Sequence, residues 1–466
     1  MATPSPTDIH ILLYPYPAPG HIIPILDLAR RLLAHPGVTV TVLVIPTYLP
    51  LLRPLLSEHP PPALHSLILP EPPLPPPSSS SSSSMASRVI SSMRGLRDLH
   101  LPLLRQWFAS HALPPAAIVS DFFLGWTHHL ARQIGIPRVV FSPSGAFGLA
   151  VAYSLWKDLP KLITESPEVS FPDLPNCPSF PIWQISAVCR GYLEAADPSL
   201  EFFREDMLAD LASWGLLLNS FNELERNYID HLKRVMGHER VWAAGPLVPA
   251  EDDVAERRGG HSSVPTHEVV TWLDSCDDGS VVYVCFGSRG LLTPRQMDEL
   301  AAGLEWSGVR FVLCCGGGVS VPAGLEQRVA GRGLVIRGWA PQVVILRHRA
   351  VGAFLTHCGW NSVMEGIAAG VVMLTWPMGS DQYTNAKLLV DQLGVGIGIG
   401  EGAEIIPEAA KLAGTLRDSV KGDRAERVRA EGLRKAALSA TEAGGSSELG
   451  VDGFMRSLRG VQRGGM

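Results

Sequence analysis

The sequence has no hydrophobic run of the roughly 18 residues that a membrane-spanning helix needs. Its N-terminal segment, Met1–Asp8, contains no basic residue. The apolar run that follows, Ile9–Tyr14, is too short and too closely followed by prolines to be a secretory signal. The 7 cysteines are odd in number and form no C-x-x-C pair, and several lie inside apolar runs, where a free thiol behaves as a small hydrophobic group. We therefore expect a soluble, cytoplasmic protein with reduced cysteines.

Charge is also scarce. Charged residues make up 18% of the chain, and 39 Lys and Arg residues stand against 45 Asp and Glu residues, a net charge of −6. No long basic run is present, so the composition argues against a nucleic-acid partner and against an anionic membrane surface.

What the sequence does contain is a repeated alternation of apolar runs and amphipathic helical patterns. Its 466 residues, 46% of them hydrophobic, are enough for two large α/β domains. Predicted buried strands in the first half are Ile9–Leu13, Val38–Ile45, Ala116–Ser120, Val139–Ser142 and Leu216–Asn219. Those in the second half are Ser280–Phe286, Arg310–Cys314, Leu334–Ile336, Val351–Leu355 and Val371–Trp376. A strand, a helix and a strand within about 40 residues imply a parallel sheet, whose ligands bind at the carboxyl ends of the strands.

Two stretches interrupt this alternation. Pro60–Ser84 is rich in proline and ends in a serine tract, a composition that predicts a mobile surface loop without chemistry. Glu251–Pro265 is charged and lacks apolar periodicity, as expected of an interdomain linker. These breaks predict an N-terminal domain over residues 1–248, a linker over 249–265 and a C-terminal domain that begins at residue 266.

One candidate site lies around His357. After an apolar strand, Gly359 permits a tight turn, and Asn361 or Ser362 starts a helix. The free N–H groups and the dipole of a helix N-terminus favour an anion such as phosphate, and His357, Asn361 and Ser362 would converge there as donors. The spacing Ser362-x-x-Glu365 is equally that of a capping box, which needs no ligand. The segment by itself leaves both interpretations open.

A second candidate site joins His21 and Asp121. His21 follows the first strand and opens the first helix, where the helix dipole disfavours imidazolium and leaves the ring available as a base. Asp121 comes directly after Ala116–Ser120, so both residues reach the same edge of a parallel sheet. A His oriented by an Asp is a general base. A single His in a turn is more often inert, however, and an Asp there can be only a helix N-cap.

The segment from Trp339 to Gln382 favours the functional interpretation of both candidate sites. Its motif residues are Trp339-Ala340-Pro341-Gln342, His348, His357-Cys358-Gly359-Trp360-Asn361-Ser362, Glu365, Trp376-Pro377 and Asp381-Gln382. This 44-residue segment (339–382) resembles, without a gap, the sugar-nucleotide box of plant UDP-dependent glycosyltransferases. Further motifs fall in the family's order: Gly20-His21-x-x-Pro24, Ser120-Asp121, Gly245-Pro246-Leu247, Trp272-Leu273-Asp274 and Phe286-Gly287-Ser288. The resemblance covers nearly the whole chain, and Ser120–Gly125 and Phe141–Phe147 look closest to a subgroup acting on flavonoids and small phenolics.

The resemblance implies a fold and a role for each motif residue. The fold is two Rossmann-like α/β domains facing across a cleft, the GT-B type, with the acceptor bound by the N-terminal domain and the UDP-sugar by the C-terminal domain. The resemblance also implies that the C-terminal domain ends at residue 445, and that a final helix over 446–466 packs back on the N-terminal domain. The implied roles are uracil stacking for Trp339, contacts near the base and ribose for Gln342, and ribose hydroxyls for Glu365. Diphosphate contacts are implied for Ser288, His357, Asn361 and Ser362, and sugar-hydroxyl contacts for Trp360, Asp381 and Gln382. A terminal Gln in this box usually accompanies UDP-glucose.

Two departures from the family pattern concern the sugar. Val372 stands where the family usually has Pro, and Gly379-Ser380 precede Asp381 where bulkier or acidic residues are common. We expect both to alter the loop that presents Asp381 and Gln382. They weaken the assignment of the sugar, not that of UDP.

These observations together predict an inverting UDP-glucose-dependent O-glucosyltransferase acting on a flavonoid or other small phenolic acceptor. By resemblance, His21, oriented by Asp121, takes the proton of the acceptor hydroxyl, which displaces UDP. We expect no cofactor and no metal, because no Asp-x-Asp motif of the metal-dependent enzymes occurs. The acceptor pocket is unassigned, since Phe122, Phe147 and Trp183 suit either a pocket or a core. We expect a monomer, because no coiled-coil or partner-helix seam is evident.

Other functions stay open at this point. Within the family, the donor could be UDP-rhamnose or the product a C-glycoside. A non-catalytic UDP-sugar-binding protein is the alternative of another class. A nicotinamide-dependent oxidoreductase is disfavoured, because Gly394-x-Gly396-x-Gly398-x-Gly400 does not match the fingerprint G-x-G-x-x-G.

Overall fold

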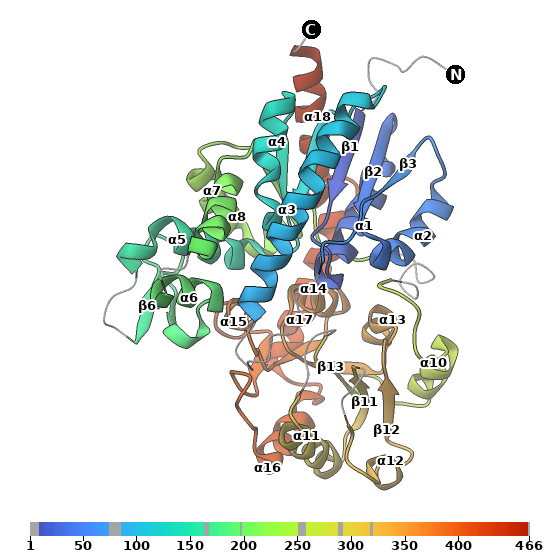
Figure 1. The fold of residues 1–466 in the computed structure, drawn as a ribbon. Coiled ribbons are helices and arrows are strands. Elements are labelled where there is room, and N and C mark those ends of the chain that lie inside the picture. The colour runs from blue at the N-terminus through green and yellow to red at the C-terminus, as the bar shows by residue number, and fades with distance from the viewer. Residues whose placement is uncertain are drawn as a thin grey trace. The chain divides into compact units, whose positions relative to one another are not determined.

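The computed structural model describes residues 9–73, 85–162, 167–195, 198–249, 258–287, 292–316 and 320–464. The chain divides into two compact units (Figure 1). The first unit comprises Met1–Leu247 together with Ala440–Met466, and the second comprises Val248–Ser439. Within the described residues, no helix is both long and apolar enough to span a membrane.

The first unit is built on a seven-stranded, wholly parallel sheet in the order β3-β2-β1-β4-β5-β8-β9. The strands are β1 (Ile9–Tyr14), β2 (Val38–Val44), β3 (Leu64–Ile68), β4 (Ala117–Asp121), β5 (Arg138–Ser142), β8 (Gly215–Leu218) and β9 (Val241–Ala243). Most of their residues are buried, because helices cover a parallel sheet on both faces. The strand order reverses between β1 and β4, the kind of position where open α/β sheets bind ligands.

Helices and one small hairpin surround this sheet. The helices are α1 (Pro19–Leu33), η1 (Pro46–Tyr48), α2 (Leu49–Glu58), α3 (Met85–Ser110), η2 (Phe122–Leu124), α4 (Thr127–Ile134), α5 (Ala146–Leu162), η3 (Ile182–Gln184), α6 (Ala187–Ala195), α7 (Pro198–Leu211), α8 (Asn222–Met236) and α18 (Ser446–Gly464). The hairpin pairs β6 (Glu168–Ser170) with β7 (Ser179–Pro181).

The last helix, α18, belongs to the first unit although it ends the chain. Figure 1 shows it in red among the blue and cyan elements of that unit. Phe454 packs edge-on against Trp242 of β9, with ring centroids 5.4 Å apart. Glu448 accepts a 3.0 Å hydrogen bond from Arg31 of α1.

The second unit holds a six-stranded, wholly parallel sheet in the order β12-β11-β10-β13-β14-β15. The strands are β10 (Val281–Cys285), β11 (Arg310–Cys315), β12 (Gly333–Arg337), β13 (Val351–Thr356), β14 (Val372–Thr375) and β15 (Gly396–Gly398). The helices are α10 (Thr266–Asp274), α11 (Pro294–Ser307), α12 (Leu325–Arg328), α13 (Gln342–Arg347), α14 (Trp360–Ala369), α15 (Gln382–Lys387), the π-helical η4 (Leu388–Gln392), α16 (Ala409–Ser419) and α17 (Ala425–Thr441), whose last two residues are assigned to the first unit.

Helix α11 shows how local sequence sets an element. Thr293 and Gln296 form a complete capping box around Pro294, and Gly308 ends the helix in the left-handed conformation. Its inner face, including Leu300 and Leu304, packs into the hydrophobic core of the second unit.

The ten predicted strands are confirmed, each within a residue or two of its expected ends. The loop predicted over Pro60–Ser84 is wrong for Leu64–Ile68, which forms β3 and pairs with β2 in parallel register. The flanking prolines mask this strand in the sequence, although none lies within Leu64–Ile68. Residues 74–84 of the predicted loop lie outside the described residues.

Candidate active site

His21 and Asp121 meet at the reversal point of the first sheet. His21 is the third residue of α1, just after β1, and Asp121 is the last residue of β4. Because Tyr14 pairs with Ser120, the two strands end side by side. The Nδ1 atom of His21 lies 2.8 Å from Oδ2 of Asp121. The carboxylate is fully buried, whereas the imidazole exposes 18% of its side chain.

Asp121 is also a cap. It is the N-cap of η2, and its Oδ1 accepts a 2.9 Å hydrogen bond from the N–H of Phe123. Since one carboxylate oxygen binds the turn and the other binds His21, the cap and the His–Asp pair exist together and are not alternatives. Among the described residues, no group hydrogen-bonds Nε2 of His21, so this nitrogen is available to a ligand.

Aromatic rings surround the imidazole. Phe122 stacks on His21 with centroids 5.9 Å apart and planes 20° apart. Tyr16 meets it edge-on at 5.3 Å, and Phe123 lies at 5.2 Å. This apolar setting strengthens the electrostatic contact between the imidazole and its carboxylate.

The three aromatic candidates for an acceptor pocket separate in the structure. Phe147 is 1% exposed and stacks on Tyr228 at 4.5 Å, so it belongs to the core. Phe122 is partly exposed beside His21, and Trp183 is 44% exposed.

In the second unit, the residues of the predicted nucleotide site follow the carboxyl ends of four strands of one parallel sheet, β12, β10, β13 and β14. Strand ends are aligned there, with Cys285 of β10 beside Thr356 of β13, and Thr356 beside Thr375 of β14. The residues that follow these strands and β12 are Trp339 and Gln342 after β12, His357, Trp360, Asn361, Ser362 and Glu365 after β13, and Asp381 and Gln382 after β14. Ser288, which follows β10, lies outside the described residues.

Trp339 is fixed through its backbone and leaves its indole partly exposed. Its N–H donates to Oγ of Ser263 at 2.8 Å, and its carbonyl accepts from the N–H of Ser263 at 2.7 Å. Gly338, with φ of 114°, allows this close approach, because a Cβ there would lie 2.1 Å from that Oγ.

Gln342, Ser362 and Glu365 form one network. The amide nitrogen of Gln342 donates to Oγ of Ser362 at 3.1 Å and to the carboxylate of Glu365. Its amide oxygen accepts from the buried hydroxyl of Tyr283 at 3.2 Å. Arg258 forms an ion pair with Glu365 from the other side. Glu365 is 5% exposed, and its carboxylate is held in place by two partners, Gln342 and Arg258.

The capping-box interpretation of Ser362 and Glu365 is therefore wrong. Helix α14 begins at Trp360, earlier than predicted, and its N-cap is Gly359 without a side-chain cap. Ser362 and Glu365 are inside the helix and point to Gln342. A tight turn does join β13 to α14, but Cys358 holds its left-handed conformation at φ of 65° while Gly359 is extended.

His357 lies between two glycine backbones. A Cβ at Gly287 would lie 2.6 Å from its ring, and a Cβ at Gly359 would lie 2.5 Å from it. Burial lowers the pKa of His357 to about 4, so the ring is neutral at pH 7. Its Nδ1 is buried and has no hydrogen-bond partner among the described residues. An unpartnered buried nitrogen of this kind fits a site completed by a ligand.

Asp381 is the N-cap of α15 and Gln382 is its first residue, and Gln382 binds the loop that precedes it. Oε1 of Gln382 accepts from the N–H groups of Met378 and Gly379 at 2.9 and 3.1 Å. Asn385 donates to Oδ2 of Asp381 at 3.1 Å and to the carbonyl of Cys358 at 2.9 Å, which ties this loop to the preceding one.

The two sequence departures have different consequences. Ser380 adopts the left-handed conformation at φ of 56°, so Gly379-Ser380 do shape the loop before Asp381. Val372 does not, because it is the buried first residue of β14, paired with Ala353 at the opposite end of the strand. The expectation that Val372 alters the loop is corrected on this ground.

Comparison with known proteins assigns the family. A family model described as UDP-glucoronosyl and UDP-glucosyl transferase matches residues 240–400. Flavonol 3-O-glucosyltransferase UGT89B1 of Arabidopsis thaliana is 48% identical over 97% of both chains. The crystal structure of Arabidopsis thaliana UGT89C1 complexed with UDP-L-rhamnose superposes with a TM-score of 0.80 at 37% identity, covering 97% of this chain and 99% of that one. The crystal structure of Medicago truncatula UGT71G1 complexed with UDP-glucose reaches 0.85 at 26% identity, covering 97% and 99%.

This chain belongs to the plant UDP-glycosyltransferases. It is an enzyme of that family, and its two parallel-sheet units have the GT-B fold. The fold class and the family expected from the sequence are both confirmed.

Two residues of this glycosyltransferase escaped sequence reasoning. Tyr283 lies inside an apolar strand, and nothing in its neighbourhood marks it as a partner of Gln342. Arg258 falls in the charged segment whose composition predicts an interdomain linker. Each acquires its role from a residue far away in sequence, which no local pattern reveals.

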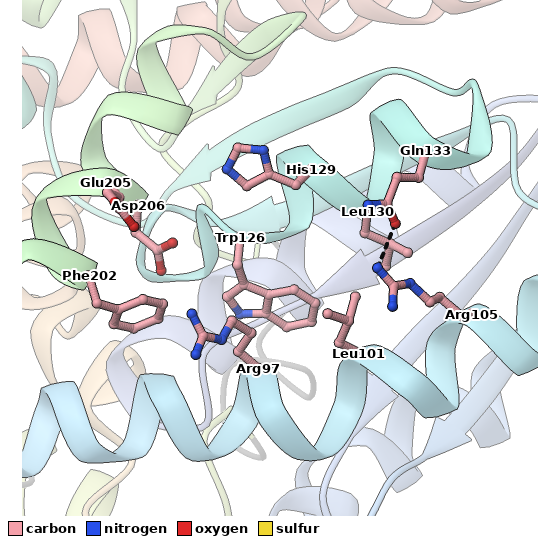
Figure 2. Close-up of a pocket in the computed structure, with 10 residues that line it drawn as sticks. All are labelled: Arg97, Leu101, Arg105, Trp126, His129, Leu130, Gln133, Phe202, Glu205 and Asp206. Carbon is pink, nitrogen blue, oxygen red and sulfur yellow. Dashed lines mark hydrogen bonds between the residues drawn. The ribbon is translucent and has the colours of Figure 1, made fainter.

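The glycosyltransferase also has a pocket away from His21. A cavity of about 170 Å³ lies between α3, α4 and α7, beside Arg97, Trp126 and Asp206 (Figure 2). Asp206 is 3% exposed, and its Oδ2 has no hydrogen-bond partner among the described residues. Burial, followed by the charge of Asp210, raises the pKa of Asp206 to about 8. This carboxyl group is therefore mostly protonated at pH 7.

Proposed function

We propose that this glycosyltransferase transfers glucose from UDP-glucose to a hydroxyl group of a flavonoid or other small phenol, with inversion at the anomeric carbon. The observation that carries the proposal is the 2.8 Å contact between Nδ1 of His21 and Oδ2 of Asp121, with the opposite ring nitrogen available. A relative that is 48% identical is named a flavonol 3-O-glucosyltransferase, and the crystal structure of a 36% identical relative is titled as a complex with quercetin.

His21 supplies the base in this proposal. Its Nδ1–H donates to Asp121, which fixes the tautomer and leaves Nε2 to accept the proton of the acceptor hydroxyl. The positive charge that develops on the imidazole is stabilised by the buried carboxylate. The hydroxyl oxygen forms a bond to the anomeric carbon while the bond to UDP breaks, so one displacement converts an α-linked donor into a β-glycoside.

The second unit supplies the donor site. We assign uracil stacking to Trp339, contacts near the base and ribose to Gln342, and ribose hydroxyls to Glu365. We assign the diphosphate to Ser288, His357, Asn361 and Ser362, and the sugar hydroxyls to Trp360, Asp381 and Gln382. Neutral His357 suits this role, because a neutral imidazole still carries one N–H, which can donate a hydrogen bond to the leaving diphosphate.

The sugar is the least constrained part of the proposal. Glucose is supported by Gln382 and by the name of the 48% identical relative. A relative at 36% identity is named a flavonol 7-O-rhamnosyltransferase, and UGT89C1 was crystallised with UDP-L-rhamnose, so rhamnose is the second candidate. The reaction as derived uses only protein groups, so we propose that it needs neither metal nor cofactor. We also propose that the enzyme acts as a monomer. In this proposal residues 1–248 bind the acceptor and residues 266–445 bind the UDP-sugar. Residues 249–265 link these two domains, and residues 446–466 complete the first unit.

A turnover experiment tests the proposal. Purified enzyme is incubated with quercetin and simpler phenols and, in parallel, with UDP-glucose, UDP-galactose, UDP-rhamnose or UDP-glucuronate. Products are identified by mass and by their stability to acid, because C-glycosides resist acid hydrolysis. Acid-labile glucosides formed fastest from UDP-glucose are expected. Acid-stable products, faster transfer from UDP-rhamnose, or UDP binding without transfer to any acceptor would each contradict it.

A further inference from the structure

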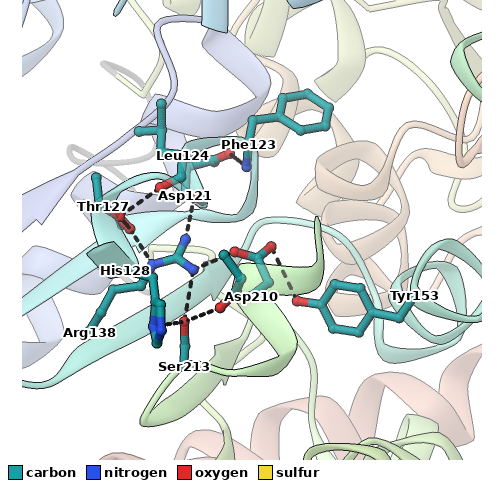
Figure 3. Close-up of polar contacts among 11 residues, drawn as sticks. Asp121, Phe123, Leu124, Thr127, His128, Arg138, Tyr153, Asp210 and Ser213 are labelled. Atoms are coloured by element: carbon teal, nitrogen blue, oxygen red, sulfur yellow. Dashed lines mark hydrogen bonds and ion pairs between the residues drawn. The ribbon is translucent and has the colours of Figure 1, made fainter. Parts of the chain in front are cut away.

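A buried arginine contacts the main chain of Asp121, the partner of the proposed base His21. Arg138 is the first residue of β5, in register with Ile118 of the neighbouring strand β4, and its side chain is completely buried. Figure 3 shows its guanidinium pointing toward the end of β4. Nη2 donates to the main-chain carbonyl of Asp121 at 3.2 Å, and Nε donates to Oγ of Ser120 at 2.9 Å.

The other side of this guanidinium is fixed by α7 and the turn after it. Nη1 of Arg138 forms an ion pair with Asp210 and donates to Oγ of Ser213 at 2.9 Å. The second oxygen of Asp210 accepts a 3.4 Å hydrogen bond from the hydroxyl of Tyr153. Arg138 therefore connects α7 to the carboxyl end of β4.

Stability alone does not require a charged pair at this place. Both side chains of the Arg138–Asp210 pair are fully buried, and burial raises the pKa of Asp210 above its usual range, although Arg138 opposes the change. Replacing a buried ion pair with apolar groups of similar size is often neutral or stabilising. What apolar groups cannot supply is the set of N–H donors that Arg138 aims at β4.

Those donors hold the turn that carries the carboxylate of Asp121. Arg138 binds the carbonyl of Asp121 at the start of η2. Ser120, which Arg138 also binds, contacts the hydroxyl of Thr127 at 2.7 Å, and that hydroxyl donates to the carbonyl of Leu124 at the end of η2 at 2.6 Å. The turn is thus held at both ends. Within this turn, the N–H of Phe123 donates to the carboxylate of Asp121, which faces His21.

We propose that Arg138, held in place by Asp210, positions Asp121 for its contact with His21. The inference rests on the proposed function, because it assigns Arg138 a role in the step that His21 performs. Arg138 touches no reacting atom and is a positioning residue that acts through Asp121.

The decisive variant removes both charges together. Arg138→Met alone would leave Asp210 buried and unpaired and would threaten folding. The double variant R138M/D210L removes the pair without leaving a buried charge, and Ser213 keeps its bond to the carbonyl of Ala209 at 2.9 Å. We expect this variant to fold, to lose about 10- to 100-fold in kcat through misplacement of Asp121, and to bind UDP as wild type does. Tyr153→Phe is the matched control, because it removes a bond to Asp210 but leaves Arg138 in place, and its kcat should stay within about twofold.

A double-mutant cycle separates positioning from general damage. In an Asp121→Ala background, R138M/D210L should change the residual kcat by less than about twofold, because the residue through which Arg138 acts is gone. Wild-type kcat in R138M/D210L, or the same loss of kcat in both backgrounds, would overturn the inference. If wild-type enzyme transfers no sugar, the proposed function fails separately. The inference is then decided by a crystal structure of R138M/D210L, in which a His21–Asp121 contact longer than about 3.5 Å is expected and a retained contact refutes it.

Discussion

Nδ1 of His21 lies 2.8 Å from Oδ2 of Asp121, although 100 residues separate the two in sequence. The contact exists because β1 and β4 are neighbours in a parallel sheet and end at the same level. A base and its orienting carboxylate are thereby placed at the point where the strand order reverses, which is where a doubly wound sheet binds ligands.

Asp121→Asn tests the orienting carboxylate. The amide keeps the shape of the side chain and can still cap η2 through its oxygen, but it cannot stabilise a protonated imidazole. We expect kcat to fall by about 10²- to 10⁴-fold at saturating donor and acceptor. Calorimetric affinity for UDP should not change, since the nucleotide residues lie in the other unit. A variant with wild-type kcat would show that the carboxylate has no role in catalysis.

Tyr283→Phe tests the network around Gln342. The hydroxyl of Tyr283 donates to the amide oxygen of Gln342 at 3.2 Å, so its loss frees the amide to rotate away from Ser362 and Glu365. We expect UDP to bind about 2- to 10-fold more weakly, the equivalent of one hydrogen bond of about 0.5–1.5 kcal/mol. Tyr153→Phe, a buried tyrosine of the first unit, is the control and should bind UDP normally. Equal affinities for all three proteins would refute the role of Tyr283.

His357→Ala and Glu365→Ala should differ in their ligand dependence. If His357 contacts the diphosphate, its loss should weaken UDP by about 10- to 100-fold and leave uridine unaffected, because a hydrogen bond to a charged group contributes about 1.5–3 kcal/mol. If Glu365 contacts the ribose, its loss should weaken UDP and uridine by the same factor. Isothermal titration calorimetry measures the affinity of each variant for UDP and for uridine. If His357→Ala weakens both ligands equally and Glu365→Ala weakens only UDP, the two assignments are wrong.

Asp206→Asn should stabilise the enzyme at alkaline pH. The pKa of Asp206 is raised from 3.8 to about 8, so the unfolded chain gives up this proton at lower pH than the folded protein. Its contribution therefore lowers stability progressively as the pH rises from about 4 to about 8. The amide cannot ionise and should gain on the order of 1–3 kcal/mol at pH 8, and less at pH 5. Denaturant unfolding at the two pH values measures this; an equal difference at both would show that ionisation of Asp206 is not the cause.

EDTA should leave turnover unchanged. The proposed displacement uses a histidine base and hydrogen-bond donors for the diphosphate, with no role for a divalent cation. The measurement is the initial rate of transfer after dialysis against EDTA and after addition of Mg²⁺ or Mn²⁺. A rate that falls with EDTA and returns with one of these ions would contradict the mechanism.

The sheets and the family could be predicted from sequence because they depend on local patterns. Continuous apolar runs mark strands buried on both faces, and the motif from Trp339 to Gln382 is specific as a string of residues. Strand β3 is not predicted because the prolines on both sides of it give the segment a loop-like composition, although none lies within Leu64–Ile68.

The details of the site could not be predicted, because they depend on which strands become neighbours. Ser362 and Glu365 have the spacing of a capping box, and only the arrival of Gln342 from another loop turns them into a network. Arg138 likewise looks like an ordinary polar residue before a strand, and its role appears only when β5 lies beside β4. Cys358 in place of Gly359 holds the left-handed conformation, which no residue preference favours.

The most direct test of the account is turnover by His21→Ala, measured together with its affinity for UDP. The account predicts that kcat falls by about 10²- to 10⁴-fold while UDP binds as tightly as to wild type, because the base lies in one unit and the nucleotide site in the other. A purified, folded His21→Ala enzyme that transfers sugar at the wild-type rate would contradict the central claim.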